Sequence, residues 1–164
     1  MSGEVVIRLG AAEDIARLRP LWEALYVDQQ QKGMVLTVPP GAFDAWAAAL
    51  TPVVNRFGCV ALAESSAGLH GFVAGRSRPI PPYFGGGMAG FVSDVFVEVA
   101  YRGRGIARGM IDRAAAFFAS TGARRLELQV VPGNAEAIAA YERMGWTREL
   151  LQMSRPLIID PSRE

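Results

Sequence analysis

The sequence predicts an α/β fold, a mixed β-sheet covered by helices, from two features of its hydrophobic pattern. Short alternating apolar runs recur along the chain, and two of them, 59–64 and 71–76, are joined by a turn signal at 65–68. This arrangement indicates an antiparallel hairpin. In the second half, a helical run lies between two alternating runs, which favours a parallel strand pair. The expected order is β-α-α-β-β-β-α-β-α-β.

The first half of the chain should hold one strand and two helices before the hairpin. The strand covers 5–9, and apolar residues at helical spacing predict a helix over 12–29. A second helix is expected over 43–50, between the breakers at 39–41 and 51–52. A loop should follow the hairpin over 78–88, because this segment holds three prolines and three consecutive glycines.

The second half is expected to alternate between strands and helices. A strand over 91–99 leads into a helix over 105–120, and a strand over 126–130 leads into a helix over 134–144. The last segment, 146–157, should supply a final strand or two.

The length of the chain favours a single domain over residues 1–164, and the 51% of residues that are hydrophobic can form its core. No apolar run reaches the roughly 18 residues of a membrane span, and the first residues lack a secretory leader. We therefore expect a cytoplasmic protein without membrane contact. The net charge of +1 gives no overall attraction to nucleic acid. The single cysteine, Cys59, excludes a multi-cysteine metal site, and we expect it in the core and no bound metal.

The most informative segment is 101–110, where the strand over 91–99 gives way to a helix. A helix start presents free backbone N–H groups and the positive end of the helix dipole, which together bind phosphate. Gly103 and Gly105 remove side chains, so a ligand can approach the backbone there.

Positive side chains surround this turn: Arg102, Arg104 and Arg108. Arg104 and Arg108 are four apart and should share a helix face, from which both can reach one anion. The alternative to a phosphate site is an ordinary turn followed by a helix whose basic face is exposed to solvent. Neither the spacing of a dinucleotide-binding glycine motif nor that of a P-loop is present.

A second group of residues, Asn134, Ala137 and Tyr141, has the spacing i, i+3, i+7 of one helix face. Asn134 is placed as a helix N-cap. The alternative is an N-cap asparagine with a half-buried tyrosine of no further role. If the strands over 91–99 and 126–130 are parallel neighbours, however, the helices that follow them begin at the same end of the sheet. Ligands of open α/β sheets bind at that end.

With these two motifs, the chain resembles the GNAT N-acetyltransferase family. The acyl-CoA motif of the family, [QR]-x-x-G-x-[GA], is met by Arg102, Gly105 and Ala107. A later motif is met by Asn134, Ala137, Tyr141, Gly145 and Trp146. The resemblance implies a mostly antiparallel sheet in which one parallel strand pair splays apart, and acetyl-CoA as co-substrate.

The resemblance also implies which residues bind the CoA group. Phe96, Val97 and Val99 would follow the pantetheine arm, and an N–H near Phe96 or Val97 would polarise the acetyl carbonyl. Asn134 is expected near the pantetheine amides. Backbone N–H groups from Arg102 to Ala107 would hold the pyrophosphate, a stretch that includes Gly103, Arg104, Gly105 and Ile106. The other residues expected to bind the CoA group are Arg108, Ala137 and Tyr141.

For catalysis, the resemblance makes Tyr141 the general acid for the departing thiolate, with a purely packing tyrosine as the alternative. A ribosomal-protein-acetylating branch carries a glutamate where this chain has Gln129, which cannot accept a proton. Asp94, Glu98 and Glu127 remain as candidate bases, and we favour Asp94. Alternation places Asp94 and Glu98 on one face unless a bulge intervenes. A relayed water is equally open.

The predicted acceptor is a primary amine, on either a small molecule or a peptide or protein. Two irregular segments, 29–41 and 78–89, are expected to select it. His70 lies at a hairpin end and is expected on the surface. A CoA-binding sensor without catalysis, a longer acyl donor and a homodimer are left open.

Overall fold

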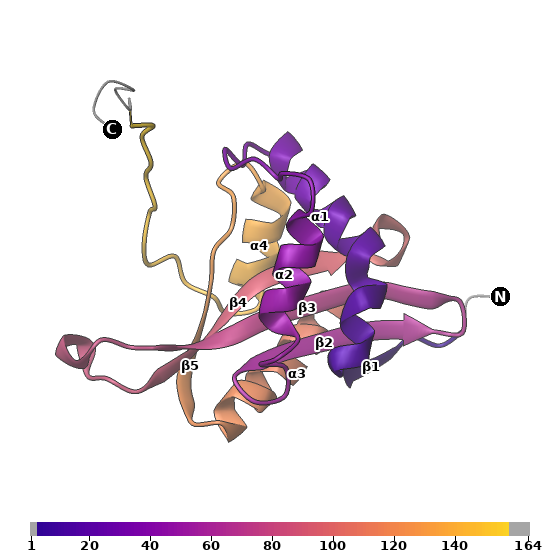
Figure 1. Cartoon of the computed structure of the whole chain (residues 1–164), viewed down its shortest axis with the longest axis horizontal. Helices are drawn as coiled ribbons and strands as arrows, with labels where there is room; N and C mark the ends of the chain where they lie inside the picture. The colour runs from indigo at the N-terminus through magenta and orange to yellow at the C-terminus, as the bar shows by residue number, and fades with distance from the viewer. Residues whose placement is uncertain (1–2, 158–164) are drawn as a thin grey trace.

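The computed structural model describes residues 3–157 and contains one five-stranded sheet in the order β1-β2-β3-β4-β5 (Figure 1). Its strands are β1 (Val6–Leu9), β2 (Gly58–Ser65), β3 (Gly68–Pro79), β4 (Met88–Val97) and β5 (Ala123–Leu128). All neighbours are antiparallel except β4 and β5, which are parallel. The predicted mixed sheet with one parallel pair is therefore confirmed.

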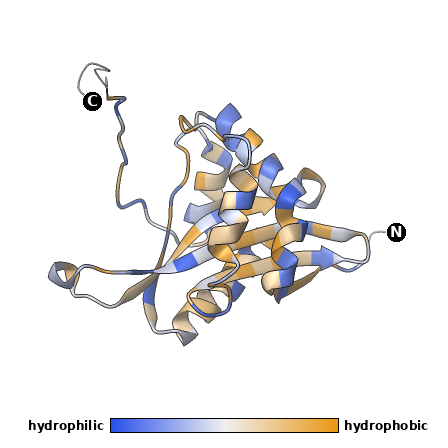
Figure 2. Ribbon diagram, viewed as in Figure 1, coloured by the Kyte–Doolittle hydropathy of each residue, from blue (hydrophilic) through white to orange (hydrophobic). Residues whose placement is uncertain are grey.

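Helices cover both faces of the sheet (Figure 1). On one face lie the 3-10 helix η1 (Ala12–Leu18), α1 (Arg19–Gln31) and α2 (Ala42–Leu50), and on the other lie α3 (Ile106–Ser120) and α4 (Ala135–Arg143). The sheet contributes alternate apolar side chains to two cores. Phe72 packs with α1 and α2, whereas Val73 packs with α3. Figure 2 shows this apolar character along the central strands.

The helix predicted over 12–29 is divided into η1 and α1. Pro20 stands in the first turn of α1, where its missing N–H would have no intrahelical partner and its fixed φ suits a helix start. The proline therefore begins a new helix instead of lying within a longer one. At its other end α1 continues to Gln31.

The parallel pair separates halfway along β4. Its pairing with β5 runs from Met88 to Val92, while β4 itself continues to Val97. On the opposite side, Ala74 pairs with Asp94 but Gly75 pairs with Val92, so Ser93 is an extra residue in β4. Ser93 is a β-bulge at the point where the two strands part. Bulges of this kind redirect side chains and occur next to active sites.

The prediction of a final strand over 146–157 is wrong. These residues form no strand and run away from the sheet (Figure 1), with Leu150 94% and Met153 85% exposed. Side chains link the segment to β5 and to the residue that follows it, through an ion pair between Arg125 and Glu149 and a hydrogen bond between Gln129 and Gln152. An alternating pattern gives a tendency to extend, but a strand also needs backbone partners.

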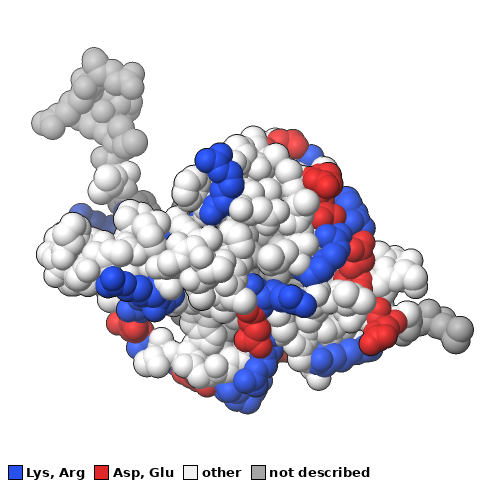
Figure 3. Space-filling view, turned by 90° about the horizontal axis from the view of Figure 1, so that it is seen from below, with Lys and Arg blue, Asp and Glu red and all other residues white. Residues whose placement is uncertain are grey.

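Charged side chains of both signs are interspersed on the face shown in Figure 3, in keeping with the net charge of +1. Within residues 3–157, no helix has the length and apolar character needed to cross a membrane.

Candidate active site

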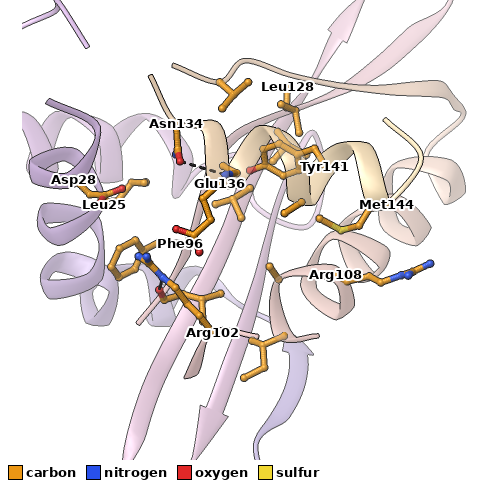
Figure 4. A pocket seen from close by; sticks show the side chains of 18 of the residues that line it. Leu25, Asp28, Phe96, Arg102, Arg108, Leu128, Asn134, Glu136, Tyr141 and Met144 are labelled. Atoms are coloured by element: carbon orange, nitrogen blue, oxygen red, sulfur yellow. Dashed lines mark hydrogen bonds between the residues drawn. The ribbon is translucent and has the colours of Figure 1, made fainter. Parts of the chain in front are cut away.

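A cleft of about 550 Å³ opens where β4 and β5 separate (Figure 4). It is lined by the C-terminal part of α1, the second half of β4, the glycine turn, the segment after β5, and α4. Of the residues predicted for the site, those that line it are Phe96, Val97, Arg102, Gly103, Gly105, Ile106, Ala107, Arg108, Asn134, Ala137 and Tyr141. Val99, Arg104 and Asp94 do not. The two sequence motifs thus meet in one cavity.

The glycine turn has the backbone geometry of an anion cradle. Gly103 and Gly105 have φ values of +73° and +75°, in the left-handed region that favours glycine. A Cβ at either position would meet no protein atom within 4 Å, so the space in front of the turn is open. Gly105 is the N-cap of α3.

Backbone N–H groups are free along this turn. Within the described chain, those of residues 103–105 have no backbone acceptor, and those of 106–108 belong to the first turn of α3. The N–H of Arg102 is different, because it donates to the carbonyl of Val99 at 3.2 Å. The free set therefore begins at Gly103.

The three arginines of the turn have different positions. Arg102 donates from Nε to the carbonyl of Val97 at 2.9 Å and lines the cleft. The prediction that Arg104 and Arg108 share a helix face is wrong, because α3 begins only at Ile106. Arg104 instead donates to the carbonyl of Ala100. Its guanidinium lies 5.2 Å from the ring centre of Tyr101 in η3 (Val99–Tyr101).

Helix α4 presents the second motif to the cleft, as its spacing predicts. The Oδ1 of Asn134 accepts the N–H of Ala137 at 3.3 Å, which confirms the N-cap. In Figure 4, Asn134, Glu136 and Tyr141 face Phe96 and Arg102 across the cavity.

Tyr141 lines the cleft with a protonated hydroxyl. It is half-buried, and its ring lies 6.1 Å from that of Trp146. Burial raises the pKa of Tyr141 to about 12, so the hydroxyl keeps its proton at neutral pH. Among the described residues, this hydroxyl has no hydrogen-bond partner, whereas that of Tyr26 is bonded to Asp94.

The three predicted candidate bases lie outside the cleft lining. Asp94 is 1% exposed, and burial raises its pKa above the ordinary value. No bulge intervenes between Asp94 and Glu98, but the Glu98 carboxylate is bonded to His70 Nδ1 at 2.9 Å. Glu127 is paired with Arg78 and Arg125.

The prediction that His70 lies on the surface is wrong. His70 is inside β3, which begins three residues earlier than the predicted strand, and it is 5% exposed. Its Nε2 lies 2.7 Å from Ser65 Oγ, and its ring stacks on Tyr101 at 3.8 Å between centres. His70 therefore supports the turn that leads into the glycines. Cys59 is buried, as predicted.

Sequence reasoning missed the contribution of Leu25 and Asp28 of α1 to the cleft. Gln29 and Lys32 also line it, and both lie in the segment 29–41 that was expected to select the acceptor. Asp28 and Lys32 form an ion pair at 2.7 Å, a spacing that was visible in the sequence. A Cβ at Gly133 would lie 2.1 Å from the carbonyl oxygen of Lys32. This glycine thus allows the segment before α4 to rest on the end of α1.

Comparison with known proteins identifies the family. A model described as the acetyltransferase (GNAT) family matches residues 16–146. The chain belongs to this family. The earlier resemblance, based on two short motifs, is therefore confirmed over most of the chain.

Two relatives of this GNAT protein match over shorter stretches. It is 38% identical over 71 residues to the mycothiol acetyltransferase of Amycolatopsis mediterranei (strain U-32). This aligned stretch is 43% of this chain and 24% of that protein. It is 44% identical over 55 residues to the streptothricin acetyltransferase of Streptomyces lavendulae. This aligned stretch is 34% of this chain and 29% of that protein. The matches thus span less than a third of either relative.

Solved structures share the GNAT fold over nearly the whole chain. An aminoglycoside N-acetyltransferase in complex with CoA has a TM-score of 0.74 at 17% identity, covering 95% of this chain and 97% of that one. A ribosomal-protein-alanine N-acetyltransferase from Brucella melitensis biovar Abortus 2308 has a TM-score of 0.71 at 23% identity, covering 94% and 100%.

Proposed function

We propose that this protein transfers an acetyl group from acetyl-CoA to a primary amine. The observation that carries the proposal is the meeting of the free N–H groups of residues 103–108 and the Asn134–Tyr141 helix face in one cleft. Family membership and the names of both relatives, each an acetyltransferase, support it.

The cleft fits a CoA group by its chemistry. The free N–H groups and the Arg102 side chain suit a pyrophosphate, and the open space at Gly103 and Gly105 leaves room for it. Phe96 and Val97 stand beyond the last β4–β5 pair, so backbone groups of this stretch are available to a pantetheine arm. Because Asn134 Oδ1 already accepts from Ala137, its amide NH₂ is left for a pantetheine carbonyl.

Catalysis then needs one proton donor and one acceptor. Acetyl-CoA, when bound, supplies a thioester whose carbonyl carbon is open to an amine. Tyr141 donates a proton to the departing sulfur, and because its pKa is raised to about 12, its hydroxyl is protonated at neutral pH. Asp94 is the proposed acceptor of the amine proton.

The proposed acceptor is an amine of a small molecule, with a peptide or protein amine as the second class to test. The names of the two relatives refer to mycothiol and streptothricin, which supports the first class. In this chain the lining residues Asp28, Gln29, Gln129 and Glu136 offer polar groups to such an acceptor.

We also propose a homodimer. In the described part of the chain, β5 is an edge strand with no partner on its outer side, and the neighbouring segment exposes Leu150, Leu151 and Met153. Light scattering after gel filtration should give twice the 17.7 kDa chain mass. A monomer at micromolar concentration contradicts this proposal.

The activity is tested by release of free thiol from acetyl-CoA over a panel of amines and amine-bearing peptides. Turnover with at least one amine is expected, and Gly105→Glu should abolish both turnover and acetyl-CoA binding. Acetyl-CoA binding without turnover on any amine would instead support the catalytically silent sensor.

A further inference from the structure

Ser93 is an exposed polar residue that lines the cleft next to the point where β4 and β5 part. It is the bulge residue of β4, so its side chain departs from the alternation of the strand. Its Oγ donates to Asp94 Oδ2 at 2.6 Å. One hydroxyl therefore joins the open cavity to a carboxylate that is 1% exposed.

The other hydrogen bonds of Asp94 come from helices α1 and α2. Tyr26 of α1 donates to Oδ1 at 2.8 Å, and Trp46 of α2 donates from Nε1 to Oδ2 at 3.1 Å. Neither of these side chains lines the cleft. Within residues 3–157, Ser93 is thus the only hydrogen-bonded route from the cleft to Asp94.

Other carboxylates are less suited to accept a proton from an amine beside the thioester. Glu98 and Glu127 are bonded to His70 and to arginines, outside the lining. Asp28 is paired with Lys32 at 2.7 Å. Glu136 points toward Phe96 and Arg102, beside the glycine turn (Figure 4).

From this geometry we infer that Ser93 is a catalytic residue that relays the proton of the acceptor amine to Asp94. The inference rests on the proposed acetyl transfer. An N–H bond of the protonated amine breaks and its proton passes to Ser93 Oγ, while the Ser93 hydroxyl proton passes to Asp94 Oδ2. The nitrogen keeps its electron pair for attack on the thioester, and Asp94 ends as a neutral carboxyl.

The surroundings of Asp94 fit an acceptor. All three of its hydrogen-bonding neighbours donate to it, as suits an ionised carboxylate. Burial raises its pKa, these hydrogen bonds lower it, and the charge of Arg76 also favours the ionised form. The net upward shift makes Asp94 a stronger base than a surface carboxylate.

The test compares Ser93→Ala with Ser93→Thr, which keeps a hydroxyl, in the full-length protein. Ser93→Ala removes one of the three hydrogen bonds to Asp94 and should melt a few degrees below the wild type, whereas Ser93→Thr should melt close to it. Ser93→Ala should lower kcat about 100-fold, the low end for general base catalysis, with the KM for acetyl-CoA within about twofold. Ser93→Thr should recover most of the activity.

The pH profile separates a relay from a structural role. Above the pKa of the acceptor amine, the amine is already neutral, so the Ser93→Ala defect should shrink as pH rises. A defect of constant size across pH 6–10, or no defect, overturns the relay while leaving acetyl transfer intact. A larger kcat loss in Glu136→Gln or Asp28→Asn than in Ser93→Ala also overturns it. Absence of wild-type turnover on any amine refutes the proposed function and the relay together.

Discussion

Replacing Gly105 with alanine should weaken CoA binding much more than it weakens the fold. The residue has φ of +75°, which an L-amino acid adopts at a cost of about 1–2 kcal/mol. A Cβ there meets no protein atom within 4 Å, so no steric cost is added. For a chain of this size, that corresponds to a fall in Tm of about 2–8 °C.

The effect on binding comes from the N–H groups that the turn aims into the cleft. If the backbone relaxes out of the left-handed conformation, at least one of these donors turns away from the pyrophosphate. A hydrogen bond to a charged group contributes about 1.5–3 kcal/mol, which corresponds to a Kd increase of about ten- to a hundredfold. Isothermal titration with CoA measures this change directly.

Gly122 provides a matched control at the other end of α3. It has φ of +89°, and a Cβ there also meets no atom within 4 Å, but it does not line the cleft. Gly122→Ala should therefore lower Tm by a similar amount and leave the Kd for CoA unchanged. Equal Kd values for the two variants would refute the assignment of the glycine turn as the phosphate site.

Three further outcomes follow from named residues. Tyr141→Phe should lower kcat at least tenfold with an unchanged KM for acetyl-CoA, and wild-type profiles between pH 6 and 9 should show no ionisation of Tyr141, whose pKa is raised to about 12. Hydrogen bonding to Arg8 lowers the pKa of Asp14, so ionised Asp14 stabilises the folded state at neutral pH, and this stabilisation is lost as the pH falls. In urea unfolding, Asp14→Asn should lower the free energy of unfolding by about 1.5–3 kcal/mol at pH 7. The difference in this free energy between the variant and the wild type should narrow below about pH 4. Burial raises the pKa of Cys59 to about 12, so thiol reagents should label it only after unfolding.

Features encoded by neighbouring residues could be predicted from the sequence. The left-handed glycines at 103 and 105 and the Asn134 cap depend on a few adjacent positions, and they lie where the pattern placed them. The parallel pair followed from a strand, a helix and a strand in succession. In each case the residues that determine the feature lie within one helical turn of it, or within the single strand–helix–strand unit that forms the parallel pair.

Features that depend on distant segments could not be predicted. The bonds of Asp94 to Tyr26 and Trp46 join residues that are 68 and 48 positions apart. The burial of His70 depends on Glu98 and on Tyr101 of η3, which follow β4 in the chain. The final segment has the pattern of a strand, but nothing local specifies whether a backbone partner is available to it.

The bulge at Ser93 explains why a buried carboxylate can lie so close to the cleft. In a regular strand, Val92 and Asp94 would point to the same face, because side chains alternate with a period of two. The extra residue changes this: Val92 packs in the core with α3, whereas Asp94 faces Tyr26 of α1 and Trp46 of α2. Ser93 stands between them at the level where β5 leaves β4. A single inserted residue thus places a hydroxyl in the cleft and a protected carboxylate directly behind it.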